Sequence, residues 1–135
     1  MFQTEKLKRT YAILIADDHE EMLQGLDSLL GQEEGFEVVG LARTGDELVA
    51  KAAELSPDLC LVDYEMPGLN GLLASQFMLK KNKKLKIIIL TMHNENSLRK
   101  RIKALGIKGY LLKDCENSEL LKAIGLVLNG ETYFI

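Results

Sequence analysis

Short apolar runs alternate with segments of helical periodicity along almost the whole of this 135-residue chain. The apolar runs are rich in leucine and β-branched residues, as expected of strands that are buried on both faces. The expected strands are residues 11–16, 36–42, 58–62, 86–90 and 108–112. A helical segment follows each strand, so the sequence predicts five strands and five helices in strict alternation. This pattern predicts an α/β fold with one parallel sheet, helices on both faces and right-handed crossovers.

Local signals mark the ends of several helices. Residues Thr44-Gly45-Asp46-Glu47 have the pattern of a capping box, in which two side chains satisfy amide groups at a helix start. Ser56-Pro57 should end that helix, because the residue before a proline disfavours helical backbone angles. The basic run at 80–84 is expected to be a solvated helix end, where cations suit the helix dipole, rather than a phosphate-binding patch.

Length and composition limit the class of protein. The chain is long enough for one domain, expected at 11–135 after a polar leader at 1–10, and 47% hydrophobic residues supply a full core. A net charge of −3 and the lack of a continuous basic stripe argue against a general nucleic-acid binder. Two cysteines, Cys60 and Cys115, make no disulfide framework, and no run reaches the roughly 18 apolar residues of a membrane span. We therefore expect a cytoplasmic protein without membrane contact.

Three expected strands deliver charged residues at the point where the apolar run stops. Asp17 and Asp18 follow the first strand, Asp63 follows the third and Lys113 follows the fifth. Parallel strands end at the same edge of a sheet, and ligands bind in the crevice outside these ends. The carboxylates and the ammonium should therefore meet in a site for a divalent cation and a phosphoryl group.

A magnesium ion fits the expected carboxylates. Neighbouring carboxylates repel one another unless a cation compensates them, and Mg²⁺ typically takes one or two carboxylates, water and phosphate oxygens. Asp18 and Asp63 are the expected direct ligands, with Asp17 nearby or acting through water and the backbone carbonyl of Glu65 as a further candidate. The pair Asp17-Asp18 alone is explained equally well as a helix start, so Asp63 carries this inference.

The same edge can support phosphoryl transfer. Asp63 can act as a nucleophile that forms an aspartyl phosphate, while Lys113 neutralises a phosphoryl oxygen. The hydroxyl of Thr91, at the end of the fourth strand, could bond a phosphoryl oxygen, and Tyr110 could then swing between outward and inward positions. Taken singly, Thr91 is also an ordinary strand terminator and Tyr110 an ordinary half-buried aromatic residue.

Together these residues resemble the receiver domain of bacterial two-component response regulators, over about residues 11–133. The acidic pair, the acceptor Asp63 before Met66-Pro67-Gly68, Thr91, Tyr110 and Lys113 occur in the order of that family. Segments 15–19, 91–93 and 110–114 are similar to the NarL/LuxR-type subfamily. Many receivers have a proline after the lysine, often with a cis bond before it, whereas Asp114 follows here, as in the NarL-like group.

The resemblance implies a flavodoxin-like, doubly wound (βα)5 sheet with strand order 2-1-3-4-5. It implies that Asp63 accepts phosphate, with Mg²⁺, from a sensor histidine kinase or a histidine phosphotransfer protein. Phosphorylation would then change a surface at about residues 96–130, with Thr91 and Tyr110 as the switch. Glu65 and His93 would tune hydrolysis of the acyl phosphate, although His93 is equally well explained as a surface residue. A phosphorylation-dependent homodimer is a further expectation.

The remaining alternatives concern chemistry and output. A haloacid dehalogenase-type phosphatase would use the same intermediate, but it wants a second aspartate where Glu65 stands. A pseudo-receiver usually lacks one of the acids or the lysine, and here all are present. We expect slow self-phosphorylation and autodephosphorylation rather than enzymatic turnover. The apolar residues 133–135 favour control of a C-terminal helix-turn-helix DNA-binding domain, absent from this chain, over a stand-alone phosphorelay receiver.

Overall fold

The computed structural model describes residues 9–135, so that most of the expected leader at 1–10 lies outside the described residues. Its elements alternate as the sequence predicts. In chain order they are β1 (Tyr11–Ala16), α1 (Glu20–Gly31), β2 (Phe36–Ala42), α2 (Gly45–Leu55), β3 (Leu59–Asp63), α3 (Gly71–Lys81), β4 (Lys86–Thr91), α4 (Asn96–Ala104), β5 (Gly109–Leu112), α5 (Asn117–Leu128) and β6 (Tyr133–Phe134).

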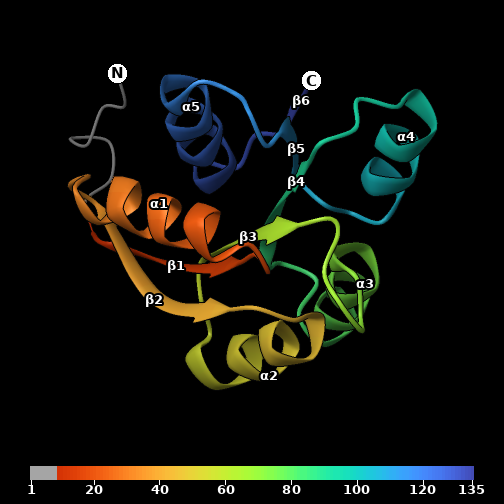
Figure 1. Ribbon diagram of the computed structural model, residues 1–135, viewed down its shortest axis with the longest axis horizontal. Coiled ribbons are helices and arrows are strands. Elements are labelled where there is room, and N and C mark those ends of the chain that lie inside the picture. Colours follow the sequence, from red (N-terminus) through yellow and green to blue (C-terminus); the bar gives the residue numbers. More distant parts are fainter. Residues whose placement is uncertain (1–8) are drawn as a thin grey trace.

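The strands form one parallel sheet in the order β2-β1-β3-β4-β5-β6 (Figure 1). The predicted order of the first five strands is confirmed. The sixth strand was not predicted, and its two residues extend the sheet beside Gly109 and Tyr110. A strand of two residues is too short to show the alternating pattern by which strands are predicted from sequence. Such a strand forms only where a neighbouring strand, here β5, offers a free edge.

Side chains of the buried strands alternate between two helical layers. Ile13 and Ile15 of β1 pack with α1 and α5 on one face, whereas Leu14 and Ala16 pack with α2, α3 and α4 on the other. Nearly every residue of β1, β3 and β4 is buried, which explains their continuous apolar sequences. The sheet is therefore covered on both faces, and its carboxyl edge stays open to solvent.

The helix ends follow the predicted signals. The Thr44 hydroxyl accepts a hydrogen bond from the Glu47 amide at 3.1 Å, while the Glu47 carboxylate accepts one from the Arg43 amide at 2.6 Å. Ser56 ends α2 in the left-handed conformation, with φ 48°. Lys80 and Lys81 lie exposed in the last turn of α3, as expected of cations near a helix carboxyl end.

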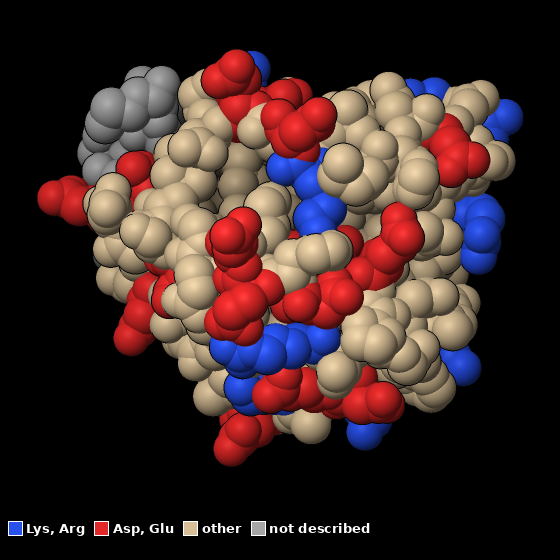
Figure 2. Space-filling model, viewed as in Figure 1, with Lys and Arg blue, Asp and Glu red and all other residues tan. Residues whose placement is uncertain are grey.

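Charge is segregated along the chain. Residues 66–112 contain ten of the 17 lysines and arginines but only one acidic residue, Glu95. Figure 2 shows basic side chains along the edge where α4 lies, whereas acidic side chains crowd the middle of this face.

Among residues 9–135, no helix combines the length and the apolar character needed to cross a membrane.

Candidate functional site

Three strand ends bring the predicted charged residues to one edge of the sheet. Main-chain hydrogen bonds fix the residues that follow the strands. The Asp17 amide bonds the Ala42 carbonyl at 3.0 Å, and the Lys113 amide bonds the Thr91 carbonyl at 2.8 Å. Asp63 is itself the last residue of β3, and the next amide bonds the Leu90 carbonyl at 2.8 Å. The side chains therefore start from a rigid backbone frame.

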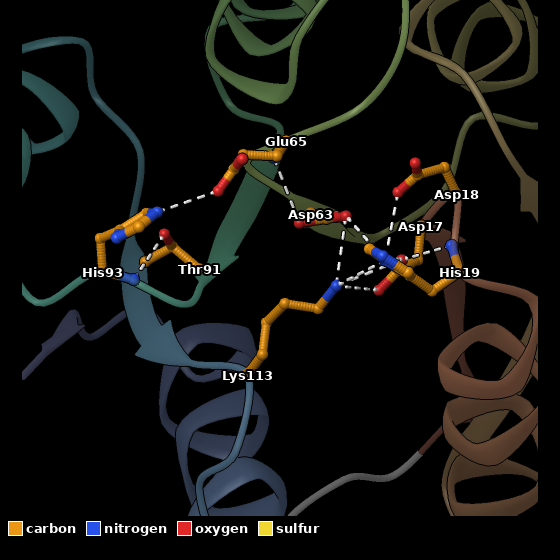
Figure 3. Close-up of polar contacts among 8 residues, drawn as sticks. All are labelled: Asp17, Asp18, His19, Asp63, Glu65, Thr91, His93 and Lys113. Atoms are coloured by element: carbon orange, nitrogen blue, oxygen red, sulfur yellow. Dashed lines mark hydrogen bonds and ion pairs between the residues drawn. The ribbon is translucent and has the colours of Figure 1, made fainter.

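The Lys113 ammonium lies between two buried carboxylates (Figure 3). Its Nζ atom is 3.0 Å from Asp17 Oδ2 and 3.3 Å from Asp63 Oδ2. Asp17 is fully buried, Asp63 is 2% exposed and the Lys113 side chain is 9% exposed. Neither of these two oxygens accepts a hydrogen bond of good geometry within the described residues. One ammonium therefore compensates two carboxylates that are largely removed from water.

Electrostatics oppose the charge on Asp63. Burial, followed by the neighbouring Asp17, raises the pKa of Asp63 from its ordinary 3.8 to about 7, and Lys113 only partly offsets this effect. Burial lowers the pKa of Lys113, but the hydrogen bond to Asp17 and the two carboxylate charges outweigh it, so that its pKa is raised. The site therefore lacks positive charge, and a cation would favour ionised Asp63.

His19 is a member of the cluster that sequence reasoning missed. Its Nδ1 atom lies 3.2 Å from Asp17 Oδ1, 3.3 Å from Asp18 Oδ1 and 4.0 Å from Asp63 Oδ2. One oxygen or nitrogen atom from each of these four residues lies within 4.8 Å of the others, which is the spacing of a metal-binding group. The position of His19 directly after the acidic pair was the only signal in the sequence.

The expected tuning residues lie on the other side of Asp63. His93 Nε2 and Glu65 Oε1 are 3.1 Å apart, and both side chains are exposed, so they connect the loops after β4 and β3 (Figure 3). The Glu65 amide donates to Asp63 Oδ1 at 3.2 Å, and the Thr91 hydroxyl accepts from the His93 amide at 3.1 Å. These contacts hold both loops beside the acceptor carboxylate.

The Tyr110 ring lies in the inward of its two expected positions. The residue is fully buried rather than half-buried, and its hydroxyl donates to the His93 carbonyl. The same hydroxyl accepts a hydrogen bond from the Glu95 amide at 3.2 Å. Because Glu95 is the N-cap of α4, the Tyr110 ring is fastened directly to the start of that helix.

At Gly71, at the end of the loop that follows Asp63, the backbone lies too close to Asp63 to leave room for a side chain. A Cβ atom added to Gly71 would lie 2.2 Å from the Asp63 carbonyl oxygen, so only glycine fits without a backbone shift. Asn70 precedes it as the N-cap of α3, and its side chain accepts from the Leu73 amide at 2.9 Å. After β5, the peptide between Lys113 and Asp114 is trans, as are all peptide bonds in the described part.

This donor set suits a divalent cation next to a nucleophilic carboxylate. Asp17, Asp18 and Asp63 supply hard oxygen atoms. Within residues 9–135, the buried atoms Asp17 Oδ2 and Asp63 Oδ2 are ion-paired with Lys113 but accept no hydrogen bond of good geometry. Lys113 adds a positive charge that could meet a phosphoryl oxygen. The fold and this edge define a class of doubly wound α/β domains with an acidic site at the carboxyl ends of the strands.

Comparisons with known proteins agree with this class. The family model of the response regulator receiver domain matches residues 13–125. The transcriptional regulatory protein DesR of Bacillus subtilis is 42% identical over 123 residues, which cover 91% of this chain and 61% of DesR. The response regulator GacA of Pseudomonas syringae is 36% identical over 121 residues, which cover 90% of this chain and 56% of GacA.

A solved structure extends the similarity to three dimensions. The two-component response regulator of the LuxR family from Aurantimonas superposes with a TM-score of 0.88 at 28% identity, covering 92% of this chain and 89% of that one. The chain thus belongs to the response regulator receiver domain family, and its relatives are NarL/LuxR-type regulators. It spans 56–61% of the length of the two curated relatives named above.

Proposed function

We propose that this chain is a phosphorylation switch in which Asp63 accepts a phosphoryl group with Mg²⁺ and changes the surface around α4, β5 and α5. The observation that carries the proposal is a buried acceptor carboxylate with the Lys113 ammonium at 3.3 Å and two further acids beside it. Receiver domains are signalling domains, so a covalent switch agrees with the family as well as with the geometry.

The transfer step needs little from the protein beyond position and charge. A carboxylate oxygen of Asp63 would form a bond to phosphorus as the P–N bond of a donor phosphohistidine breaks. The leaving imidazole keeps the electron pair of that bond and takes a proton from water. Lys113 would hold a phosphoryl oxygen, and Thr91 would bond another after transfer.

The acidic residues fit a magnesium ion. Asp18 and Asp63 would be direct ligands, with Asp17 beside them and the Glu65 carbonyl as a further ligand. When bound, Mg²⁺ would neutralise charge on the transferring phosphoryl oxygens. The raised pKa of Asp63, which is caused first by burial and then by the neighbouring Asp17 charge, is consistent with this assignment, because a bound cation would offset both effects.

Phosphate would come from a sensor histidine kinase or a histidine phosphotransfer protein, and the output would be transcription. DesR carries the name of a transcriptional regulatory protein, and this chain spans only part of its length. We therefore propose that a C-terminal DNA-binding domain is controlled by the switch, in preference to a stand-alone phosphorelay receiver. The phosphatase alternative loses its support, because the family match is to receivers and Glu65 pairs with His93.

Mass spectrometry after treatment with acetyl phosphate and Mg²⁺ tests the proposal. Wild-type protein should gain the mass of one phosphoryl group on Asp63, whereas Asp63→Ala and metal-free wild type should gain none. Lys113→Ala should still be labelled, but its surface around α4 should not respond. Labelling at another residue, or an unmodified wild type with a competent donor and metal, would overturn the assignment of Asp63.

A further inference from the structure

We propose that the outer side of α3 and the groove between α3 and the end of α4 bind an acidic amphipathic helix of another protein. This surface, the α3 docking face, lies on the sheet face opposite to α5 and does not require phosphorylation of Asp63. The residues that carry the inference are Leu73, Phe77, Leu79, Lys80, Lys83 and Lys108.

Two large apolar side chains are exposed on α3. Leu73 is 45% exposed and Phe77 is 51% exposed, although the other apolar residues of this helix are buried. Residues three or four positions apart lie on the same side of a helix, so these two and Lys80 form one stripe along α3. Single exposed apolar residues are normal on a surface, whereas a pair on one helix side indicates contact with a partner.

A groove of about 390 Å³ adjoins this stripe, between α3 and the loop that leads from α4 to β5. Its volume is more than ten times the roughly 30 Å³ that one water occupies in the liquid, so the groove can admit side chains. Leu79 and Leu105 line it with apolar surface, and the lysines that line it are Lys80, Lys83 and Lys108. The groove therefore offers apolar contact together with positive charge.

The basic residues near the α3 docking face lack acidic partners. Segment 66–112 contains ten lysines and arginines, and none of them forms an ion pair with a carboxylate in the part of the chain that the structure describes. Elsewhere, Arg9, Arg43, Lys51 and Lys113 all have such partners. Figure 2 shows basic side chains along the edge at α4, beside an uncharged area over α3. A partner with carboxylates would thus gain attraction without breaking ion pairs of this domain.

A helix matches this surface better than a nucleic acid or a membrane does. DNA would bring phosphates for the lysines, but its polar interface would leave Leu73 and Phe77 without apolar contacts. A membrane would need a continuous apolar helix face, whereas the rest of the apolar surface of α3 is buried in the core. An amphipathic helix supplies apolar side chains one turn apart and carboxylates beside them, which is the combination that the α3 docking face presents.

Fluorescence anisotropy with a labelled synthetic peptide tests the inference on the whole chain. The probe is a helix-forming peptide of about 18 residues, with leucines on one face and glutamates on the other, which spans about 27 Å against about 16 Å for α3. A scrambled peptide of the same composition keeps the charge without the apolar face. A DNA duplex and vesicles of phosphatidylcholine and phosphatidylserine test the other two classes of partner.

We expect the amphipathic peptide to bind at least about tenfold more tightly than the scrambled peptide at low ionic strength. Its affinity should fall about tenfold when the salt concentration is raised to about 0.3 M. Equal binding of the two peptides, or tighter binding of the duplex or the vesicles, would overturn the assignment to an acidic helix.

Two variants with matched controls locate the binding surface. Phe77→Gln and Lys80→Glu should each weaken binding of the amphipathic peptide about fivefold or more, through loss of apolar contact and reversal of charge. Met92→Gln and Lys122→Glu make equivalent changes at exposed positions outside the α3 docking face and should bind like wild type. All four side chains are exposed, so the variants should keep the wild-type fold. Weakening that is equal in each variant and its control would show that net charge or general stickiness drives binding, and would overturn the α3 docking face.

Discussion

Asp63 makes the stability of the metal-free protein depend on pH. The folded state holds the pKa of this carboxyl at about 7, whereas the ordinary value is 3.8. Between these values the unfolded chain has already lost the proton that the folded protein retains. Asp63 therefore makes its full contribution to the free energy of unfolding below about pH 4, and this contribution is lost as the pH rises through about 7.

Substitution of this one residue should remove the pH dependence. We expect metal-free wild type to lose stability, on the order of 2–4 kcal/mol, as the pH rises from 4 to 8. Asp63→Asn keeps the shape without the charge and should be more stable than wild type at pH 8. Urea unfolding in the presence of a chelator measures both. An equal slope in the two proteins would show that Asp63 is not the group responsible, and added Mg²⁺ should reduce the slope in wild type only.

At the scale of the elements, the start of α3 fixes the backbone of Asp63. A methyl group on Gly71 would lie 2.2 Å from the Asp63 carbonyl oxygen, whereas a methyl group on Gly25 of α1 would meet nothing within 4 Å. Gly71→Ala should therefore destabilise the fold by about 2 kcal/mol or more through a forced backbone shift. Gly25→Ala should stabilise it by about 0.5–1 kcal/mol, because alanine is the better helix former. Thermal unfolding of the two variants checks this contrast, and similar effects of both would contradict it.

The helix α4 is held by few apolar contacts and by Tyr110. Only Leu98 and Ile102 of this helix are buried, and the Tyr110 hydroxyl bonds the loop that leads into it. Loss of this hydroxyl in Tyr110→Phe should cost about 1–2 kcal/mol. Amide hydrogens at 95–99 should then exchange about tenfold faster, while those of β1 and β3 keep their protection.

Tyr133→Phe is the matched control for this prediction. Its hydroxyl bonds Glu119 of α5 at 2.8 Å, so that variant should leave exchange in α4 unchanged. Equal exchange in both variants and wild type would mean that the Tyr110 hydroxyl does not restrain α4.

At the scale of the whole molecule, phosphorylation is expected to change association. We predict that beryllofluoride, a stable mimic of the phosphoryl group, converts the protein to a dimer in the presence of Mg²⁺. Light scattering should show a doubled mass for wild type and an unchanged mass for Asp63→Asn. Dimers of wild type that form equally well without beryllofluoride would contradict the prediction.

The sequence predicted the alternating elements and the residues at the carboxyl edge, because hydrophobic periodicity, turn chemistry and strand ends are local signals. The order of five strands followed only from the resemblance to the receiver family. It did not predict β6, since Tyr133 and Phe134 become a strand only where β5 offers a free edge. It missed His19, because contact with Asp63 depends on how β1 and β3 lie side by side. The position of Tyr110 depended likewise on a hydrogen bond to a distant loop.

The attachment of Tyr110 to the loop before α4 also gives the protein an optical reporter. The chain contains four tyrosines and no tryptophan, so tyrosine emission is not masked. When the Tyr110 hydroxyl leaves the His93 carbonyl, the surroundings of the tyrosine ring change. The fluorescence emission of the protein should change at the same time. Rapid-mixing fluorescence, with Tyr110→Phe as the blank, would then time the motion of this ring without any attached dye.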